Sequence, residues 1–190
     1  MRRLFSLFPV LALAVATLSA PVSADEASLF KALKGGGHVA LIRHALAPGT
    51  GDPDNFELGK CETQRNLSDE GRAQAQRMGE KLRVNGLAQA FVYSSQWCRC
   101  LDTARLMALG PVTEIPQLNS LYRHPERRES QTRDLRDWIA AQREDAPLVL
   151  VTHQFTINGI VGEYTKSGEI VVARRDRDGS LTVVGTIETN

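Results

Sequence analysis

The chain lacks most of the features that would assign it to a function class by composition alone. Its 190 residues include 23 lysines and arginines against 22 aspartates and glutamates, so neither charge is in excess. A balanced charge gives no general attraction for nucleic acid or anionic lipid, and an anionic ligand must be bound by a local cluster. The sequence has no internal repeat and no low-complexity segment. Its glycine run, residues 35–37, lacks the Lys-Ser/Thr pair of a phosphate-binding P-loop, which argues against nucleotide binding of that kind.

Cysteine is also scarce, and the three present are Cys61, Cys98 and Cys100. They lack the paired spacing of a zinc ribbon or finger, so we expect no metal site. Cys98 and Cys100 are separated by one residue, which is too close for an easy mutual bond. In an oxidising compartment we therefore expect Cys61 to be bonded to Cys98 or Cys100, with a preference for Cys98, and one thiol to remain free.

The N-terminal segment, residues 1–24, has the order of a secretory signal peptide. Two arginines precede an apolar core, Leu4–Leu18, and small residues follow it. We place cleavage after Ala24, with a poorer alternative after Ala20. The core is shorter than the ~20 residues that span a bilayer, and no later run is longer, so we expect no stable membrane insertion. The sequence thus predicts a protein that is exported to the periplasm or secreted.

Cleavage would leave residues 25–190, which form one domain's worth of sequence. Loss of the two signal-peptide arginines leaves 21 of the 23 basic residues against 22 acidic ones, a net charge of −1. Strand and helix patterns alternate along this region, which predicts an α/β sandwich with a largely parallel sheet. The expected strands are 38–42, 90–95, 112–115, 148–152, 169–175 and 181–187, the last two forming a hairpin. The expected helices are 28–33, 69–86, 98–109, 132–144 and one that begins at 154.

Charged and titratable side chains follow three of the expected parallel strands where each ends. Arg43 and His44 follow the first strand, His153 follows the aliphatic strand 148–152, and Arg99 lies one turn into the helix after strand 90–95. Ligands of such sheets gather beyond the carboxyl ends of the strands. Two guanidiniums and two imidazoles at one edge form a pocket suited to a tetrahedral dianion, and a helix beginning at Gln154 adds backbone N–H donors.

Four motifs, in the same order along residues 38–162, resemble those of the histidine phosphatase superfamily, the phosphoglycerate-mutase-like group. They are "LIRHA", "NLSDEGRAQA", "SSQWCRCLDTA" and "VLVTHQFTI". The resemblance implies a three-layer α/β/α sandwich. It also implies that His44 is the nucleophile and forms a phosphohistidine, that Arg43 and Arg99 clamp the phosphoryl oxygens, and that His153 hydrogen-bonds them. The arginines take the place of a metal cation, so no metal and no cofactor is expected.

The sequence departs from the family pattern at the general acid that protonates the leaving oxygen. Asn119 and Ser120 stand near the position where many members have a glutamate, and Gln154 stands where others have an aspartate directly after the second histidine. Ala45 replaces the usual glycine after the nucleophile and is small enough to be tolerated. Loop carboxylates have no spacing argument in their favour, and we expect most of them to be surface charges: Asp52, Asp54, Glu57, Glu62, Glu126 and Glu129.

Two further residues are candidates for substrate binding. Arg65, in the long loop 44–66, would add a donor to the pocket if it does not lie on the surface, and Gln154 follows His153 directly. Long loops without regular structure are often functional. The sequence predicts an exported phosphomonoesterase that acts on a phosphorylated small molecule or peptide. A phosphomutase is disfavoured by export and by the missing glutamate, and a binding module that has lost turnover is the alternative from another class.

Overall fold

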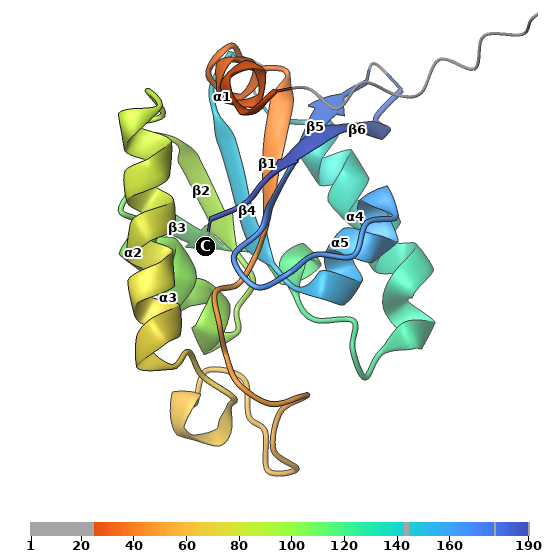
Figure 1. Ribbon diagram of the computed structural model, residues 1–190. Coiled ribbons are helices and arrows are strands. Elements are labelled where there is room, and N and C mark those ends of the chain that lie inside the picture. Colours follow the sequence, from red (N-terminus) through yellow and green to blue (C-terminus); the bar gives the residue numbers. More distant parts are fainter. Residues whose placement is uncertain (1–24, 143–144, 177, 190) are drawn as a thin grey trace, which may run out of the picture.

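The computed structural model describes residues 25–142, 145–176 and 178–189, so the predicted signal peptide lies outside the described residues. Six strands form one sheet in the order β3-β2-β4-β1-β5-β6 (Figure 1). Strands β1, β2, β3 and β4 are parallel, and β5 runs antiparallel to both β1 and β6. This confirms the largely parallel sheet and the closing hairpin. The strands are β1 (His38–Arg43), β2 (Phe91–Ser94), β3 (Val112–Glu114), β4 (Leu148–Thr152), β5 (Ile170–Arg175) and β6 (Leu181–Ile187).

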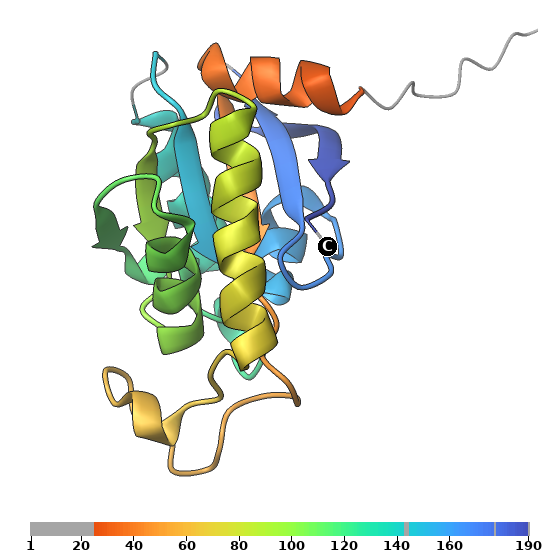
Figure 2. The same ribbon diagram turned by 60° about the vertical axis from the view of Figure 1, so that its left-hand side comes forward.

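Helices cover both faces of the sheet and complete the three layers (Figures 1 and 2). They are α1 (Glu26–Lys34), α2 (Asp69–Val84), α3 (Cys98–Met107), α4 (Arg128–Ala140) and α5 (Gln154–Val161). Helix α2 begins as predicted, because the Ser68 hydroxyl accepts a hydrogen bond from the Gly71 backbone N–H. The expected start of α4 at Thr132 is wrong by one turn. The Thr132 hydroxyl donates to the Arg128 carbonyl at 2.7 Å, so Thr132 lies inside the helix.

Alternating side chains of β1 fill two separate cores. Ala40 and Ile42 pack with buried residues of α1, α2 and α3, whereas Val39 and Leu41 pack with residues of α4 and α5. All four side chains are fully buried. Burying a branched aliphatic side chain contributes roughly 1.5–3 kcal/mol, so these two cores hold the central strand in its register. They thereby determine where its carboxyl end lies.

The long loop between β1 and α2 lies beyond the carboxyl end of the sheet (Figures 1 and 2). It contains a short 3₁₀ turn, Cys61–Thr63, and is tied to the start of α3 by a disulfide between Cys61 and Cys98. This is the pairing that the sequence favoured. Cys100 is a buried free thiol. Within the described residues, no helix is both long enough and apolar enough to cross a membrane.

Candidate active site

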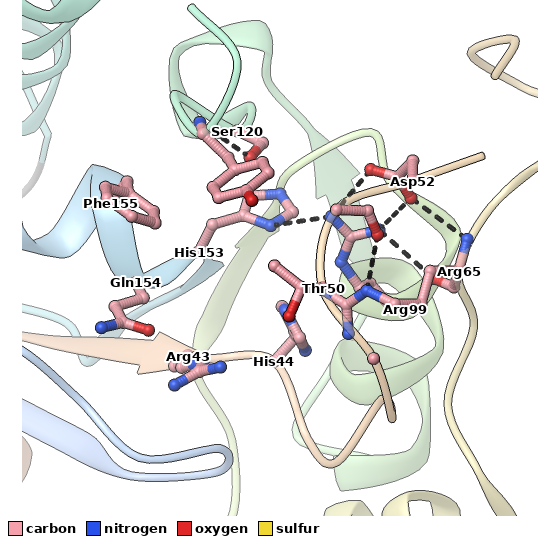
Figure 3. A pocket seen from close by; sticks show the side chains of 13 residues that line it. Arg43, His44, Thr50, Asp52, Arg65, Arg99, Ser120, His153, Gln154 and Phe155 are labelled. Atoms are coloured by element: carbon pink, nitrogen blue, oxygen red, sulfur yellow. Dashed lines mark hydrogen bonds and ion pairs between the residues drawn. The ribbon is translucent and has the colours of Figure 1, made fainter. Parts of the chain in front are cut away.

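A pocket of about 150 Å³ opens at the carboxyl ends of β1 and β4 (Figure 3). It is smaller than the roughly 300–1,000 Å³ of pockets that enclose drug-sized ligands, so it suits a small group such as a phosphoryl. The six residues predicted for the site all line it: Arg43, His44, Arg65, Arg99, His153 and Gln154. Parallel pairing of β1 with β4 aligns Arg43 with Thr152, which brings the residues after both strands to one edge.

His44 is buried and its tautomer follows from its hydrogen bond. Its Nδ1 lies 2.8 Å from the carbonyl oxygen of Ala45, and because a carbonyl only accepts, Nδ1 carries the proton. The Nε2 lone pair is therefore available to the pocket. Burial, reinforced by the positive charge of Arg99, holds the pKa of His44 well below 6.5. The imidazole is neutral at physiological pH, as a nucleophile must be.

Arg43 and Arg99 each present a buried nitrogen that has no acceptor among the described residues. Nη1 of Arg43 donates to the Thr165 carbonyl at 2.6 Å, but its Nε has no acceptor, and neither has Nε of Arg99. Buried donors are almost always paired in folded proteins, and an unpaired one is costly. Two such donors at the edge of one small pocket favour an anion as the missing partner.

His153 belongs to a chain of hydrogen bonds that determines its protonation. The Ser95 hydroxyl donates to Oδ1 of Asn119 at 3.2 Å, so it must accept from His153, whose Nε2 lies 2.9 Å away. His153 thus carries its proton on Nε2. Burial and then the charge of Arg99 place its pKa well below 6.5. Asn119, near the position of the family's glutamate, accepts from Ser95 and from the Gln96 backbone and has no acidic proton to donate.

Cys100 contacts the same histidine but is not a second nucleophile. Its Sγ lies 3.4 Å from Nε2 of His153 and is fully buried. Burial raises the pKa of the Cys100 thiol to about 12, so the thiolate is not formed at physiological pH. The thiol packs against the imidazole and helps to hold the ring in place.

Arg65 lies at the pocket, and its contacts show that it also holds the loop. Its Nε donates to the carbonyl of Gly51 at 2.8 Å, and its Nη1 donates to the carbonyl of Ala47. The side chain therefore braces the backbone turn that forms one wall of the pocket. Gln154 is the first residue of α5, as predicted, and lines the opposite side (Figure 3).

Asp52 is the exception among the six loop carboxylates, most of which the sequence predicts to be surface charges. Its carboxylate accepts from Nη1 of Arg99 at 2.6 Å and from Nη2 at 3.2 Å, and its side chain is 14% exposed. It also accepts from the Trp97 indole at 3.0 Å and from the Arg65 backbone at 3.1 Å. Burial alone would raise the pKa of Asp52, but the hydrogen bonds and charge of Arg99 outweigh it and lower the pKa.

The other five loop carboxylates are exposed, in agreement with the sequence analysis. Nothing in the sequence around Asp52 distinguishes it from them. It lies in a turn of glycine and proline residues, and its partner Arg99 is 47 residues away in the chain. The ion pair depends on the path of the loop, which local patterns do not encode.

Comparisons with known proteins agree with the fold described above. Residues 39–123 match the model of the histidine phosphatase superfamily (branch 1). Similar solved structures include the protein histidine phosphatase SixA complexed with tungstate, with a TM-score of 0.58 and 14% identity over 80% of this chain and 97% of that one. A phosphoserine phosphatase from Entamoeba histolytica has a TM-score of 0.58 and 16% identity, over 80% and 98%. YhfR of Bacillus stearothermophilus has a TM-score of 0.57 and 14% identity, over 78% and 95%. A sequence search of curated proteins found no match.

Proposed function

We propose that this chain, which belongs to the histidine phosphatase superfamily, is an exported phosphomonoesterase that hydrolyses a phosphorylated small molecule or peptide through a phosphohistidine. The observation that carries the proposal is the pairing of a neutral His44, with Nε2 available, and two buried arginine Nε donors that lack an acceptor. Together they supply a nucleophile and an anion site within one small pocket. Phosphoryl transfer requires little more than positioning and charge stabilisation.

In the first half of the reaction, Nε2 of His44 attacks phosphorus in line with the ester oxygen. The N–P bond forms as the P–O bond breaks, and the leaving oxygen takes its proton from solvent. Arg43 and Arg99 neutralise the charge on the equatorial oxygens. The Ala45 carbonyl accepts from Nδ1 of His44 and stabilises the positive charge that the ring gains.

In the second half, water attacks the phosphorus from the side vacated by the alcohol. The N–P bond breaks, water contributes its oxygen and releases a proton, and His44 returns to its neutral form with inorganic phosphate as the product. Nδ1 of His153 carries no proton in this tautomer and lies 3.5 Å from Nη2 of Arg99, so it accepts from Arg99 and does not donate to a phosphoryl oxygen. Arginine side chains supply the positive charge, so we propose that the reaction requires no metal ion. We expect activity to be unchanged after dialysis against a chelator.

Export is supported by the signal-like sequence of residues 1–24 and by the Cys61–Cys98 disulfide, since such bonds persist in oxidising compartments. Cleavage after Ala24 would keep helix α1 intact, because its capping residue is Asp25, whose side chain accepts from the Ser28 N–H at 2.8 Å. Sequencing the N-terminus of protein recovered from the exported fraction tests this. An N-terminus at residue 25 is expected, and retention of residues 1–24 would contradict it.

The catalytic proposal is tested by replacing the nucleophile. His44→Ala should abolish hydrolysis of an aryl phosphate, because among the described residues no other side chain is placed to accept the phosphoryl. Acid-quenched wild-type protein, or a slow His153→Ala variant, should carry phosphate that is acid-labile and base-stable on the peptide containing His44. Near-normal activity of His44→Ala, or a label on Ser94 or Ser95, would show that the assignment is wrong.

A further inference from the structure

Asp52 is the carboxylate that lines the pocket among the described residues, and it binds an arginine that the proposed reaction needs. A guanidinium has five N–H groups in fixed directions. Two of those on Arg99 point to Asp52, one from Nη1 at 2.6 Å and one from Nη2 at 3.2 Å. The second N–H of Nη1 donates to the backbone carbonyl of Arg65 at 3.2 Å. Three of the five donors are therefore committed to the protein.

The two donors that remain lie on one edge of the guanidinium. They are the N–H of Nε, which is buried without an acceptor, and the second N–H of Nη2. The latter is 3.5 Å from Nδ1 of His153, at the outer limit of a hydrogen bond. This pair forms a planar fork with the spacing of two phosphoryl oxygens. Figure 3 shows the arrangement, with Asp52 on one side of Arg99 and His153 on the other.

Resting on the proposed function, we infer that Asp52 is a positioning residue: it binds the far edge of Arg99 and so presents the Nε–Nη2 edge to the phosphoryl group. Its other contacts suit that role. The Trp97 indole and the Arg65 backbone both donate to the carboxylate, so Asp52 is itself held from two sides. Trp97 stacks on Phe56 with ring centroids 5.0 Å apart, which fixes the indole.

Asp52 is not suited to be the missing general acid. A general acid needs a proton near the operating pH, whereas this carboxylate accepts four hydrogen bonds and has nothing left to donate. The two roles predict different kinetics. An acid matters most for poor leaving groups, whereas a residue that orients Arg99 affects every substrate alike.

The test compares Asp52→Ala and Asp52→Asn with wild type. Loss of the carboxylate lets Arg99 turn, and kcat should fall on the order of 10²-fold, as when one charge-stabilising donor is removed. The dissociation constant for inorganic phosphate, measured by calorimetry, should stay equal or become smaller, because a negative charge has left an anion site. The fall in kcat should be the same across aryl and alkyl phosphates. Weaker phosphate binding in step with kcat, or a loss that grows with leaving-group pKa, would overturn the proposal.

A double-mutant cycle with Arg99→Ala tests whether Asp52 acts through this arginine. Arg99→Ala alone should weaken phosphate binding about 10-fold or more, since it removes hydrogen bonds from a charged group. It also leaves Asp52 as a buried, unpaired carboxylate beside the anion. Asp52→Ala should therefore improve phosphate binding in the Arg99→Ala background, and kcat should fall no further. If instead the fold-losses in kcat of the two single variants multiplied in the double variant, Asp52 would act independently of Arg99.

Asp54→Ala is the matched control, because Asp54 lies two residues away in the same loop and its side chain is fully exposed. Its kinetics and phosphate affinity should equal those of wild type. Circular dichroism and thermal unfolding check that each variant folds. If Asp52→Ala does not fold, Asp52→Asn replaces it in the test, because the asparagine keeps one acceptor oxygen. The affinity for inorganic phosphate can be measured whether or not the protein hydrolyses a substrate. If His44→Ala kept full activity, the proposed function would fail, and the binding cycle would still decide whether Asp52 orients Arg99.

Discussion

Three guanidiniums and one carboxylate surround His44, and their charges determine what the pocket binds. Arg43, Arg65 and Arg99 together with Asp52 give a net charge near +2, which matches a phosphomonoester dianion. The same cations, with burial, keep His44 neutral. In the proposed mechanism each arginine therefore has two effects: it binds phosphoryl oxygens, and its positive charge disfavours protonation of His44.

Replacing either clamp arginine should mainly affect catalysis. Arg43→Ala and Arg99→Ala should each lower kcat/KM on the order of 10²–10³-fold, by analogy with removal of one charge-stabilising donor. Steady-state kinetics on an aryl phosphate measure the effect. Arg105→Ala, on the exposed side of α3, is the control and should change nothing. A loss of less than about 3-fold for Arg99→Ala would mean that its unpaired Nε does not face the phosphoryl group.

Rates should depend steeply on the leaving group, because no described residue at the pocket is placed to protonate it. Asn119 has no acidic proton, and Asp52 is held as a carboxylate by Arg99. Aryl phosphates should be hydrolysed much faster than alkyl phosphates, with log(kcat/KM) falling as leaving-group pKa rises. Glu126→Gln and Glu129→Gln, both exposed, should have small effects. A single such replacement that removed activity on both ester types would identify the acid.

At the scale of elements, the start of α3 and the loop before α2 form one unit. Helix α3 carries Arg99, and the loop reaches it through the Cys61–Cys98 disulfide and the Asp52–Arg99 ion pair. Beyond this unit, toward the other end of α3, helices α2 and α3 pack closely: a Cβ on Gly79 would lie 2.0 Å from the Met107 carbonyl oxygen. The arginine is thus held from the loop side by covalent and ionic contacts, and the helix that carries it is held by packing against α2.

Removing the disulfide should destabilise the fold and impair the site. The bond closes a loop with a sequence separation of 37, which is worth about 4 kcal/mol in the chain-entropy model, and measured values are often smaller. Cys61→Ser should lower the free energy of unfolding in urea by up to that amount and also lower kcat, since the loop carries Asp52. Wild type after mild reduction should behave in the same way. Unchanged stability and kcat in both would show that the loop holds its position without the bond.

At the scale of the whole molecule, burial of two neutral imidazoles links stability to pH. The folded-state pKa values of His44 and His153 lie well below the ordinary 6.5. Between those values and 6.5 the unfolded chain takes up protons that the folded protein does not. Stability from this source is therefore complete above about pH 6.5 and is lost as pH falls below it.

Stability should consequently fall with a slope that approaches about 1.4 kcal/mol per pH unit for each of these histidines once the pH is about one unit below 6.5. Urea unfolding at pH 7.5 and pH 5.5 measures the slope. His153→Asn should make the dependence shallower, because one titrating group has been removed. Asp52 contributes only in a lower window, since its pKa lies below 3.8. Stability that stays constant from pH 7.5 to 5.5 would show that the histidines are protonated in the folded state.

The sequence by itself determined the sheet, the two helical layers and the four residues at the strand ends. Apolar periodicity located β1 and β4, and parallel pairing then requires the residues that follow them to meet, which placed Arg43, His44 and His153 together. Capping chemistry located the start of α2, and the one-residue spacing of Cys98 and Cys100 limited the disulfide to two pairings. These features depend on neighbouring residues in the chain or on the order of the strands, so the pattern of residues along the sequence predicts them.

Only the tertiary structure decided the role of Asp52, the brace that Arg65 forms across its loop, and the choice of Cys98 over Cys100. The Asp52–Arg99 pair joins residues 47 apart, and the Arg65 contacts reach 14 and 18 residues back along the chain. Loop 44–66 has no periodicity, so its path is determined by where its few charged side chains find partners. The packing of the sheet and α3 brings those partners within reach of the loop. Local sequence patterns do not specify how close two residues so far apart in the chain will lie.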